Sequence, residues 1–250
     1  MPSGDNPEVT TRNRPGRRTA GYLALGVVIT LALFWIPGGH YVAYPLMLIS
    51  TVAHEMGHGL AALLVGGRFE SLKMWPNGSG VAAWSAAVGA LGRAIVAAGG
   101  LVGPALAAAL AFWAGRESKH SQAVLGILAA GLLLAEVLVV RNLFGFLFIG
   151  GLALLLGAIA LRAPAHVAQI TLLFLGVQLA LSSWSRSDYL FTDVAMTAQG
   201  PMPSDVAQIA DALWLPYWFW GGLCALFSLL VIGLGLTSLG PKRTAGVRRR

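Results

Sequence analysis

The stretch Ser50-Thr51-Val52-Ala53-His54-Glu55-Met56-Gly57-His58-Gly59-Leu60 places three groups that can bind or serve a metal ion inside an apolar run. On an α-helix of about 3.6 residues per turn, positions i and i+4 lie one above the other, so His54 and His58 can share one Zn²⁺. Glu55 lies beside that face. A carboxylate there can accept a proton from a water molecule whose pKa a bound zinc lowers to about 7, and can later pass it to a leaving amine.

A motif with only three fixed positions also occurs by chance in unrelated soluble helices. In this chain, however, the flanking residues 44–50 and 60–65 are mainly apolar. Ionisable side chains inside a bilayer are costly unless they are paired or bound to a metal. The sequence therefore favours a metal centre, with Glu55 as its general base.

These residues resemble the site-2 protease family of intramembrane zinc metallopeptidases, which carry H-E-x-G-H in a membrane helix. Met56-Gly57 fits that form, and a looser similarity extends from about Tyr41 to about Leu230. The resemblance is to the shorter bacterial branch of the family. It implies a zinc-dependent endopeptidase that hydrolyses peptide bonds of membrane-embedded protein substrates.

The composition is that of a protein that lies in a lipid bilayer. Hydrophobic residues make up 56% of the 250 residues and charged residues only 11%, and the mean hydropathy is +0.72. These values exclude a water-soluble domain and predict an all-α polytopic membrane protein with about six or seven transmembrane helices. The single cysteine, Cys224, excludes an intrachain disulfide and a cysteine-based zinc site. No feature indicates an oligomeric state.

The net charge of +7 comes largely from basic residues near the two ends of the chain, next to apolar segments. This placement is typical of topology signals and of contact with anionic lipid, and we expect no nucleic-acid partner.

We divide the chain into a polar tail at residues 1–19, an integral membrane domain at 20–238 and a basic tail at 239–250. The first tail is expected to be disordered and cytoplasmic, because it is polar and has no apolar periodicity. The apolar run after it lacks a clean small-x-small cleavage site and is interpreted as a retained span. The predicted spans are residues 20–36, 42–65, 87–113, 124–140, 143–161, 167–184 and 214–236.

The positive-inside rule favours a cytoplasmic N-terminus in a multi-pass protein of the cell membrane. Seven spans would then place the C-terminus outside, whereas its basic residues favour the inside. Either a segment within residues 124–161 does not fully cross, or the C-terminal charges are overruled by the rest of the chain.

Residues 66–84 change pattern, with Asn77-Gly78 between short alternating runs, which predicts a membrane-associated β-hairpin. The family resemblance implies that this hairpin dips toward the active site and that its exposed edge holds a substrate strand. An ordinary turn between two spans is the alternative interpretation.

Two other features have both a structural and a functional interpretation. Pro104, after several glycines, is expected to kink or break its helix, and the small residues are expected to permit close helix packing. Glu136 is expected to pair with Arg141 near the interface. Residues 116–120 are expected to form a polar loop.

A catalytic zinc normally has three protein ligands and one open position, so a third ligand is needed. The family resemblance implies an aspartate from a distant helix. Ser204-Asp205, followed by Pro216 to Trp220, resembles the Ser-Asp segment of the shorter branch, and we predict Asp205 as the ligand. Asp193 is the next candidate, followed by Asp188 and Asp211. Ser204-Asp205 is also typical of a helix N-cap.

Three function classes fit these features to different degrees. The leading hypothesis is an intramembrane zinc endopeptidase. A non-proteolytic zinc-binding scaffold or carrier is the alternative, although such a site needs no general base like Glu55. A secondary transporter would need ionisable residues spread along a pathway, whereas here they gather around one site.

Overall fold

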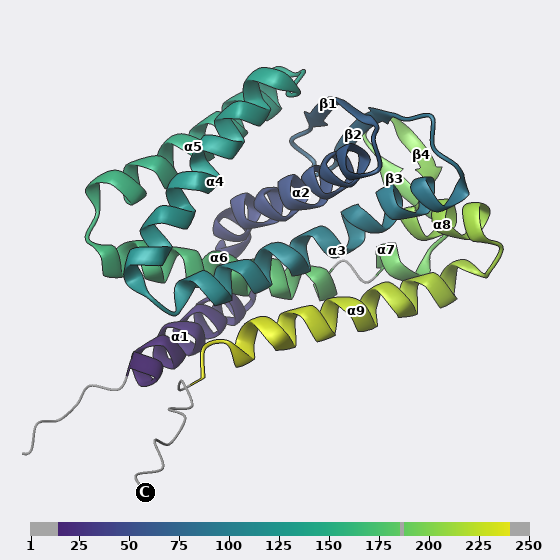
Figure 1. The fold of residues 1–250 in the computed structure, drawn as a ribbon. Coiled ribbons are helices and arrows are strands. Elements are labelled where there is room, and N and C mark those ends of the chain that lie inside the picture. The colour runs from purple at the N-terminus through teal and green to yellow at the C-terminus, as the bar shows by residue number, and fades with distance from the viewer. Residues whose placement is uncertain (1–14, 186–187, 241–250) are drawn as a thin grey trace, which may run out of the picture.

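The computed structural model describes residues 15–185 and 188–240, so that most of both predicted tails lies outside the described residues. Its helices are α1 (Pro15–Trp35), α2 (Gly39–Leu64), α3 (Ala90–Gly115), α4 (Ser118–Leu138), α5 (Leu143–Arg162), α6 (Ala165–Ser185), α7 (Asp188–Phe191), α8 (Asp205–Leu213) and α9 (Tyr217–Thr237). Its strands are β1 (Arg68–Met74), β2 (Gly80–Ser85), β3 (Val194–Thr197) and β4 (Gly200–Pro203). Helix α3 packs against α2, α6, α8 and α9 (Figure 1).

Within residues 15–185 and 188–240, five helices are long and apolar enough to cross a membrane: α3, α4, α5, α6 and α9. Within α1, the stretch Thr19–Leu33 is also apolar. In α2, the polar side chains of the motif lower the mean hydropathy. The prediction of an all-α polytopic membrane protein with a hairpin after the motif helix is confirmed.

Helices α2 and α3 cross at a contact between glycines. A Cβ atom added to Gly57 would collide with the backbone of Gly99, and one added to Gly103 would lie 2.9 Å from the carbonyl oxygen of Ala53. Small residues at such a crossing let two backbones approach closely. The predicted close packing is therefore found, and its partner is the motif helix itself.

The first hairpin follows α2 directly. Gly66, with φ of 81°, adopts the left-handed conformation that ends the helix, and β1 then pairs antiparallel with β2, with Leu72 opposite Ala82. Leu72 also exchanges backbone hydrogen bonds with Val139 and Arg141 on its other side. β1 is therefore paired on both edges at this point.

The predicted start of the last span at residue 214 is too early. Trp214 has a left-handed backbone, with φ of 68°, and caps the C-terminus of α8, and α9 begins at Tyr217 directly after Pro216. Proline suits a position just before a helix because it has no N–H to leave unpaired.

Two further expectations are corrected in part. Pro104 lies inside helix α3, which continues to Gly115, so the break does not occur and a kink stays a prediction. The polar loop predicted at residues 116–120 is shorter, because α4 already begins at Ser118.

The expected pair of Glu136 and Arg141 is not among the salt bridges of the described residues. The Arg141 guanidinium turns back and donates to the carbonyl oxygens of Leu138 and Val140 at the end of α4. A basic side chain suits this position because the last carbonyls of a helix lack partners within it. Glu136 instead lies buried against Gly150 of α5.

The start of α1 and the end of α9 lie at the same end of the bundle (Figure 1). Tyr22 and Leu23 of α1 and Leu239 after α9 pack against one buried cluster that includes Phe112. The cytoplasmic placement of the N-terminus stays a prediction.

Candidate metal centre

The helical spacing brings the two histidine rings of α2 together as the sequence predicts. The Nε2 atoms of His54 and His58 are 3.2 Å apart, and the ring planes are inclined at 89°. Both imidazoles therefore point their Nε2 atoms at one small volume.

Asp205 completes this cluster from a segment far along the chain. Its Oδ2 atom lies 3.2 Å from Nε2 of His54, and its Oδ1 atom lies 3.3 Å from Nε2 of His58. Asp205 begins α8, and the hydroxyl of Ser204 caps that helix by accepting a hydrogen bond from the N–H of Ala207. Both interpretations of Ser204-Asp205 therefore hold: Ser204 is the helix N-cap, and the side chain of Asp205 points in a different direction, into the cluster.

These three side chains fit a zinc ion. Zinc sites are usually tetrahedral with Zn–N and Zn–O distances of about 2.0–2.2 Å, which places neighbouring ligand atoms about 3.3–3.6 Å apart. The separations of 3.2 and 3.3 Å in the cluster are close to that value. Three protein ligands would leave the fourth position for water or substrate.

The Asp205 carboxyl is in the form that a metal requires. Burial on its own disfavours ionisation, but the charge of His58 and hydrogen bonds from both imidazoles outweigh burial and hold the pKa of Asp205 below its usual range. The side chain is therefore an ionised carboxylate.

A backbone carbonyl orients His58. Its Nδ1 atom lies 2.9 Å from the carbonyl oxygen of Val96 in α3. Because that oxygen can only accept, Nδ1 carries a proton, and loss of the second proton from Nε2 would leave the Nε2 lone pair for a metal. Gly100, one turn further along α3, leaves room for the ring, since a Cβ atom there would overlap the imidazole.

Glu55 lies beside the cluster, only 6% exposed, and faces the first hairpin. A Cβ atom on Gly80, at the start of β2, would lie 2.7 Å from Cγ and 2.9 Å from Oε1 of Glu55. The hairpin turn is held against the same face of α2 by Thr51, which donates to the carbonyl oxygen of Gly78 at 2.8 Å, and by Tyr44, which donates to that of Pro76 at 2.7 Å. β2 therefore begins directly against the candidate general base.

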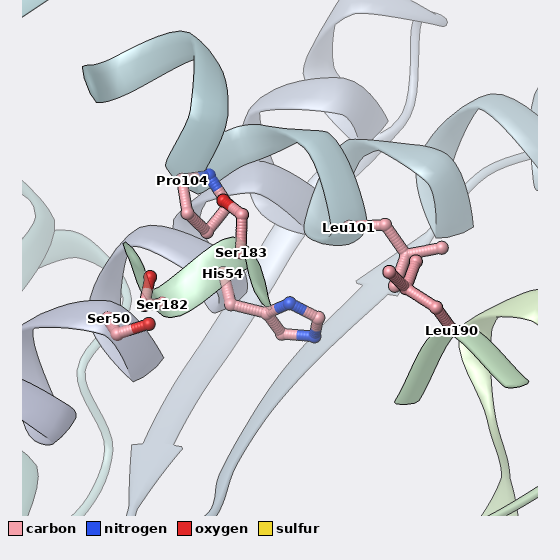
Figure 2. A pocket seen from close by; sticks show the side chains of 7 residues that line it. All are labelled: Ser50, His54, Leu101, Pro104, Ser182, Ser183 and Leu190. Atoms are coloured by element: carbon pink, nitrogen blue, oxygen red, sulfur yellow. The ribbon is translucent and has the colours of Figure 1, made fainter. Parts of the chain in front are cut away.

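A cavity of about 30 Å³ opens beside His54, which exceeds the roughly 10–15 Å³ that one water needs. Figure 2 shows Ser50 and Ser182 on one side of the His54 ring and two leucines on the other. The hydroxyls of Ser182 and Ser183 donate to the carbonyl oxygen of Leu179. Its lining residues are Ser50, His54, Leu101, Pro104, Ser182, Ser183 and Leu190.

The other candidate aspartates lie elsewhere or outside the described side chains. Asp193 and Asp211 are exposed, and neither belongs to the group that can hold a metal. Asp193 instead contributes its backbone carbonyl, which accepts a hydrogen bond from Ser204. The side chain of Asp188 lies outside the described part of the chain. Among the described residues, His54, His58 and Asp205 form the one group of metal-ligating side chains.

Sequence reasoning missed three residues or segments that shape the site. Gly80 has no sequence signal beyond its place in a turn. Asn142 accepts from the N–H of Met74 and donates to its carbonyl, as a neighbouring strand would, but its partner is 68 positions away. The second hairpin had a weak signal in Gln199-Gly200, and Gly200 has φ of 106°.

Apolar membrane helices, a cluster of two histidines and an aspartate, and a buried glutamate beside the cluster define the class of membrane metallopeptidases. The chain belongs to the family described as Peptidase M50B-like, whose model matches residues 24–235. This match agrees with the resemblance to site-2 proteases. Comparison with curated proteins and with solved structures gives no match.

Proposed function

We propose that this protein is a zinc-dependent intramembrane endopeptidase of the cell membrane that hydrolyses peptide bonds of membrane-embedded proteins. The observation that carries the proposal is the placement of Glu55 between the His54, His58 and Asp205 cluster and the start of β2. A metal-ligand cluster alone would suit a storage or structural site. A buried carboxylate beside it, with a strand against that carboxylate, suits hydrolysis of an extended peptide.

Zinc held by the three ligands would act as a Lewis acid that polarises the scissile carbonyl and makes water more acidic. Glu55 accepts a proton from the water as its oxygen bonds to the carbonyl carbon, and then delivers that proton to the amide nitrogen, so that the C=O bond re-forms, the C–N bond breaks and the amine leaves. The serine-lined cavity beside His54 is large enough for a water molecule at a site surrounded by apolar helices.

The first hairpin offers a substrate only one open edge. On β1, the backbone of Leu72 pairs outward with Val139 and Arg141, and Met74 pairs outward with the Asn142 amide. Their partners across the ladder are Ala82 and Gly80. In an antiparallel ladder, the two residues of a pair point their backbone groups either toward each other or away from each other. Because Leu72 and Met74 point theirs away from β2, Ala82 and Gly80 point theirs away from β1, toward the free edge of β2.

An extended peptide that adds to the free edge of β2 would pass beside Glu55. Strand addition uses backbone hydrogen bonds and therefore accepts many sequences, while it keeps the peptide in the unwound form that cleavage needs. We therefore expect the substrate to be a helical membrane segment that unwinds near its cleavage site.

Replacement of one carboxylate tests this function. Glu55→Gln should retain one zinc per protein but lose about 10²–10⁴-fold in cleavage rate, because an amide cannot accept the proton. The readouts are metal analysis and mass-spectrometric detection of products from single-span membrane proteins reconstituted with the enzyme in liposomes. Glu136→Gln, at a buried carboxylate of α4, is the matched control and should cleave at the normal rate. A zinc-loaded wild-type protein that cleaves none of these substrates would favour the scaffold alternative, and normal cleavage by Glu55→Gln would remove Glu55 from the mechanism.

A further inference from the structure

The second hairpin, formed by β3 and β4, has an open edge on β3, and the positions of the prolines in β4 identify it. β3 pairs with β4 so that Ala195 lies opposite Met202 and Thr197 opposite Gly200, while Val194 and Met196 lie opposite prolines. Proline has no N–H, so the hydrogen-bonded pairs are the two without proline. Val194 and Met196 therefore point their backbone groups away from β4, and among the described residues neither N–H donates to a backbone carbonyl outside the hairpin.

The open edge of β3 faces the first hairpin. The N–H of Ala198, the residue after β3, lies 3.3 Å from the hydroxyl of Ser79, the residue before β2. β2 and β3 also lie next to each other in Figure 1. They belong to separate two-stranded sheets, so the backbone groups of the two neighbouring edges are not paired with each other.

The other end of the second hairpin is fixed to the metal cluster. The N–H of Ser204 donates to the carbonyl oxygen of Asp193 at 2.9 Å, and its hydroxyl donates to that of Thr192 at 2.6 Å. Asp205 is the next residue. The open edge of β3 thus runs from the third candidate ligand toward the turn that lies over α2.

We propose that β3 forms the second wall of the substrate cleft, so that an extended segment of the polypeptide substrate is bound between β2 and β3 and hydrogen-bonds to both. This inference rests on the proposed function and concerns how the same site holds its substrate. A peptide strand is the occupant that fits, because it supplies acceptors and donors to both edges, whereas lipid tails would leave the N–H groups of Val194 and Met196 unpaired. The exposed side chains of Val194 and Met196 add an apolar lining that suits a membrane-derived segment.

A proline substitution on the open edge tests the second wall. Met196→Pro removes one outward N–H without removing a hydrogen bond to β4, as Pro201 and Pro203 already do on the opposite strand. Met196→Ala is the matched control, because it removes the side chain and keeps the N–H. The probe is an extended peptide hydroxamate, whose hydroxamate binds zinc and whose peptide chain can lie along the cleft. Acetohydroxamic acid, which reaches only the metal, is the reference ligand.

Met196→Pro should weaken binding of the peptide hydroxamate about five- to tenfold relative to Met196→Ala, as expected for one lost hydrogen bond, and should leave acetohydroxamic acid and zinc content unchanged. Equal affinity of the two variants for the peptide hydroxamate would overturn the inference. Failure of zinc-loaded wild type to bind acetohydroxamic acid would instead count against the proposed function.

A crosslinking measurement keeps the inference testable if the proline variant does not fold. A photoreactive benzoylphenylalanine at position 196 should crosslink to the bound peptide hydroxamate, because Met196 is 70% exposed beside the cleft. The same residue at position 113, where Trp113 is exposed near the end of α3, should not crosslink. Equal labelling at both positions, or none at position 196 while the probe is bound, would contradict a second wall at β3.

Discussion

Two carboxylates of this protein are buried almost equally in apolar helices, and their surroundings differ. Glu55 of α2 is 6% exposed and Glu136 of α4 is 8% exposed. Glu55 lies beside a three-residue metal-ligand cluster and under the start of β2. Glu136 faces the backbone of Gly150 in α5, and its Oε2 atom has no hydrogen-bond partner among the described residues.

The contrast teaches that burial of an acid does not by itself mark a site. An ionisable residue in a membrane helix is a functional candidate in general, and by that rule both glutamates qualify equally. The neighbouring helices separate them. Asp205 of α8 lies against the two histidines of α2, and the ligand atoms are 3.2–3.3 Å from one another, whereas the α4–α5 contact brings the backbone of Gly150 to Glu136.

The largest effect is expected from removal of Asp205, the candidate ligand that α8 supplies. Asp205→Ala should lower zinc affinity by more than about 100-fold, since loss of a residue that only orients a ligand already costs about 10–100-fold. Asp211→Ala is the control, because Asp211 is exposed in the same helix and should leave zinc affinity unchanged. Competition with a chromogenic chelator measures the affinities. Similar zinc binding by the two variants would remove Asp205 from the site.

A smaller loss is expected from a methyl group at the α2–α3 crossing. Gly100→Ala puts a Cβ atom onto the His58 imidazole, so the ring must move away from the carbonyl oxygen of Val96. We expect zinc affinity to fall about 10–100-fold, the range for disturbed ligand orientation. Gly131→Ala in α4, where the added atom meets nothing within 4 Å, is the control. Unchanged affinity in Gly100→Ala would mean that the crossing does not position His58.

A substitution in β2 that lowers activity and leaves the zinc content unchanged would distinguish the role of the strand from that of the metal cluster. Gly80→Ala presses a methyl group against Glu55 and should displace the carboxylate or the edge of β2. We expect kcat/KM for a membrane substrate to fall about tenfold or more, because small misplacement of a catalytic group is costly. Zinc content should stay at one per protein. Gly222→Ala, at an open position of α9, is expected to retain normal kinetics, and equal rates for the two variants would contradict the contact.

The features predicted correctly from the residues alone are those that depend on short spacings along the chain. His54 and His58 share a face because helix geometry depends only on their four-residue separation. Asp205 was reachable only through family resemblance, since nothing local links it to α2. The contacts of Gly80 with Glu55 and of Asn142 with Met74 depend on tertiary packing, so no periodic pattern in the sequence indicates them. The predicted pair of Glu136 and Arg141 is wrong because an arginine at this position can either pair with an acid or cap a helix end.

The smallest effect, and of opposite sign, is expected at the second carboxylate. Glu136→Met replaces a buried acid that has an unpartnered oxygen with an unbranched apolar side chain of similar length, which adapts to the space beside Gly150. An unsatisfied buried polar group costs about 1–3 kcal/mol, so removal of even the lower value should raise the midpoint of thermal unfolding in detergent by about 2–4 °C. Glu70→Met, at an exposed position of β1, should change the midpoint little. Zinc content should be normal in both variants. A lower midpoint for Glu136→Met would mean that this carboxylate has a stabilising partner in the membrane, and the contrast with Glu55 would then lie in the kind of partner rather than in its absence.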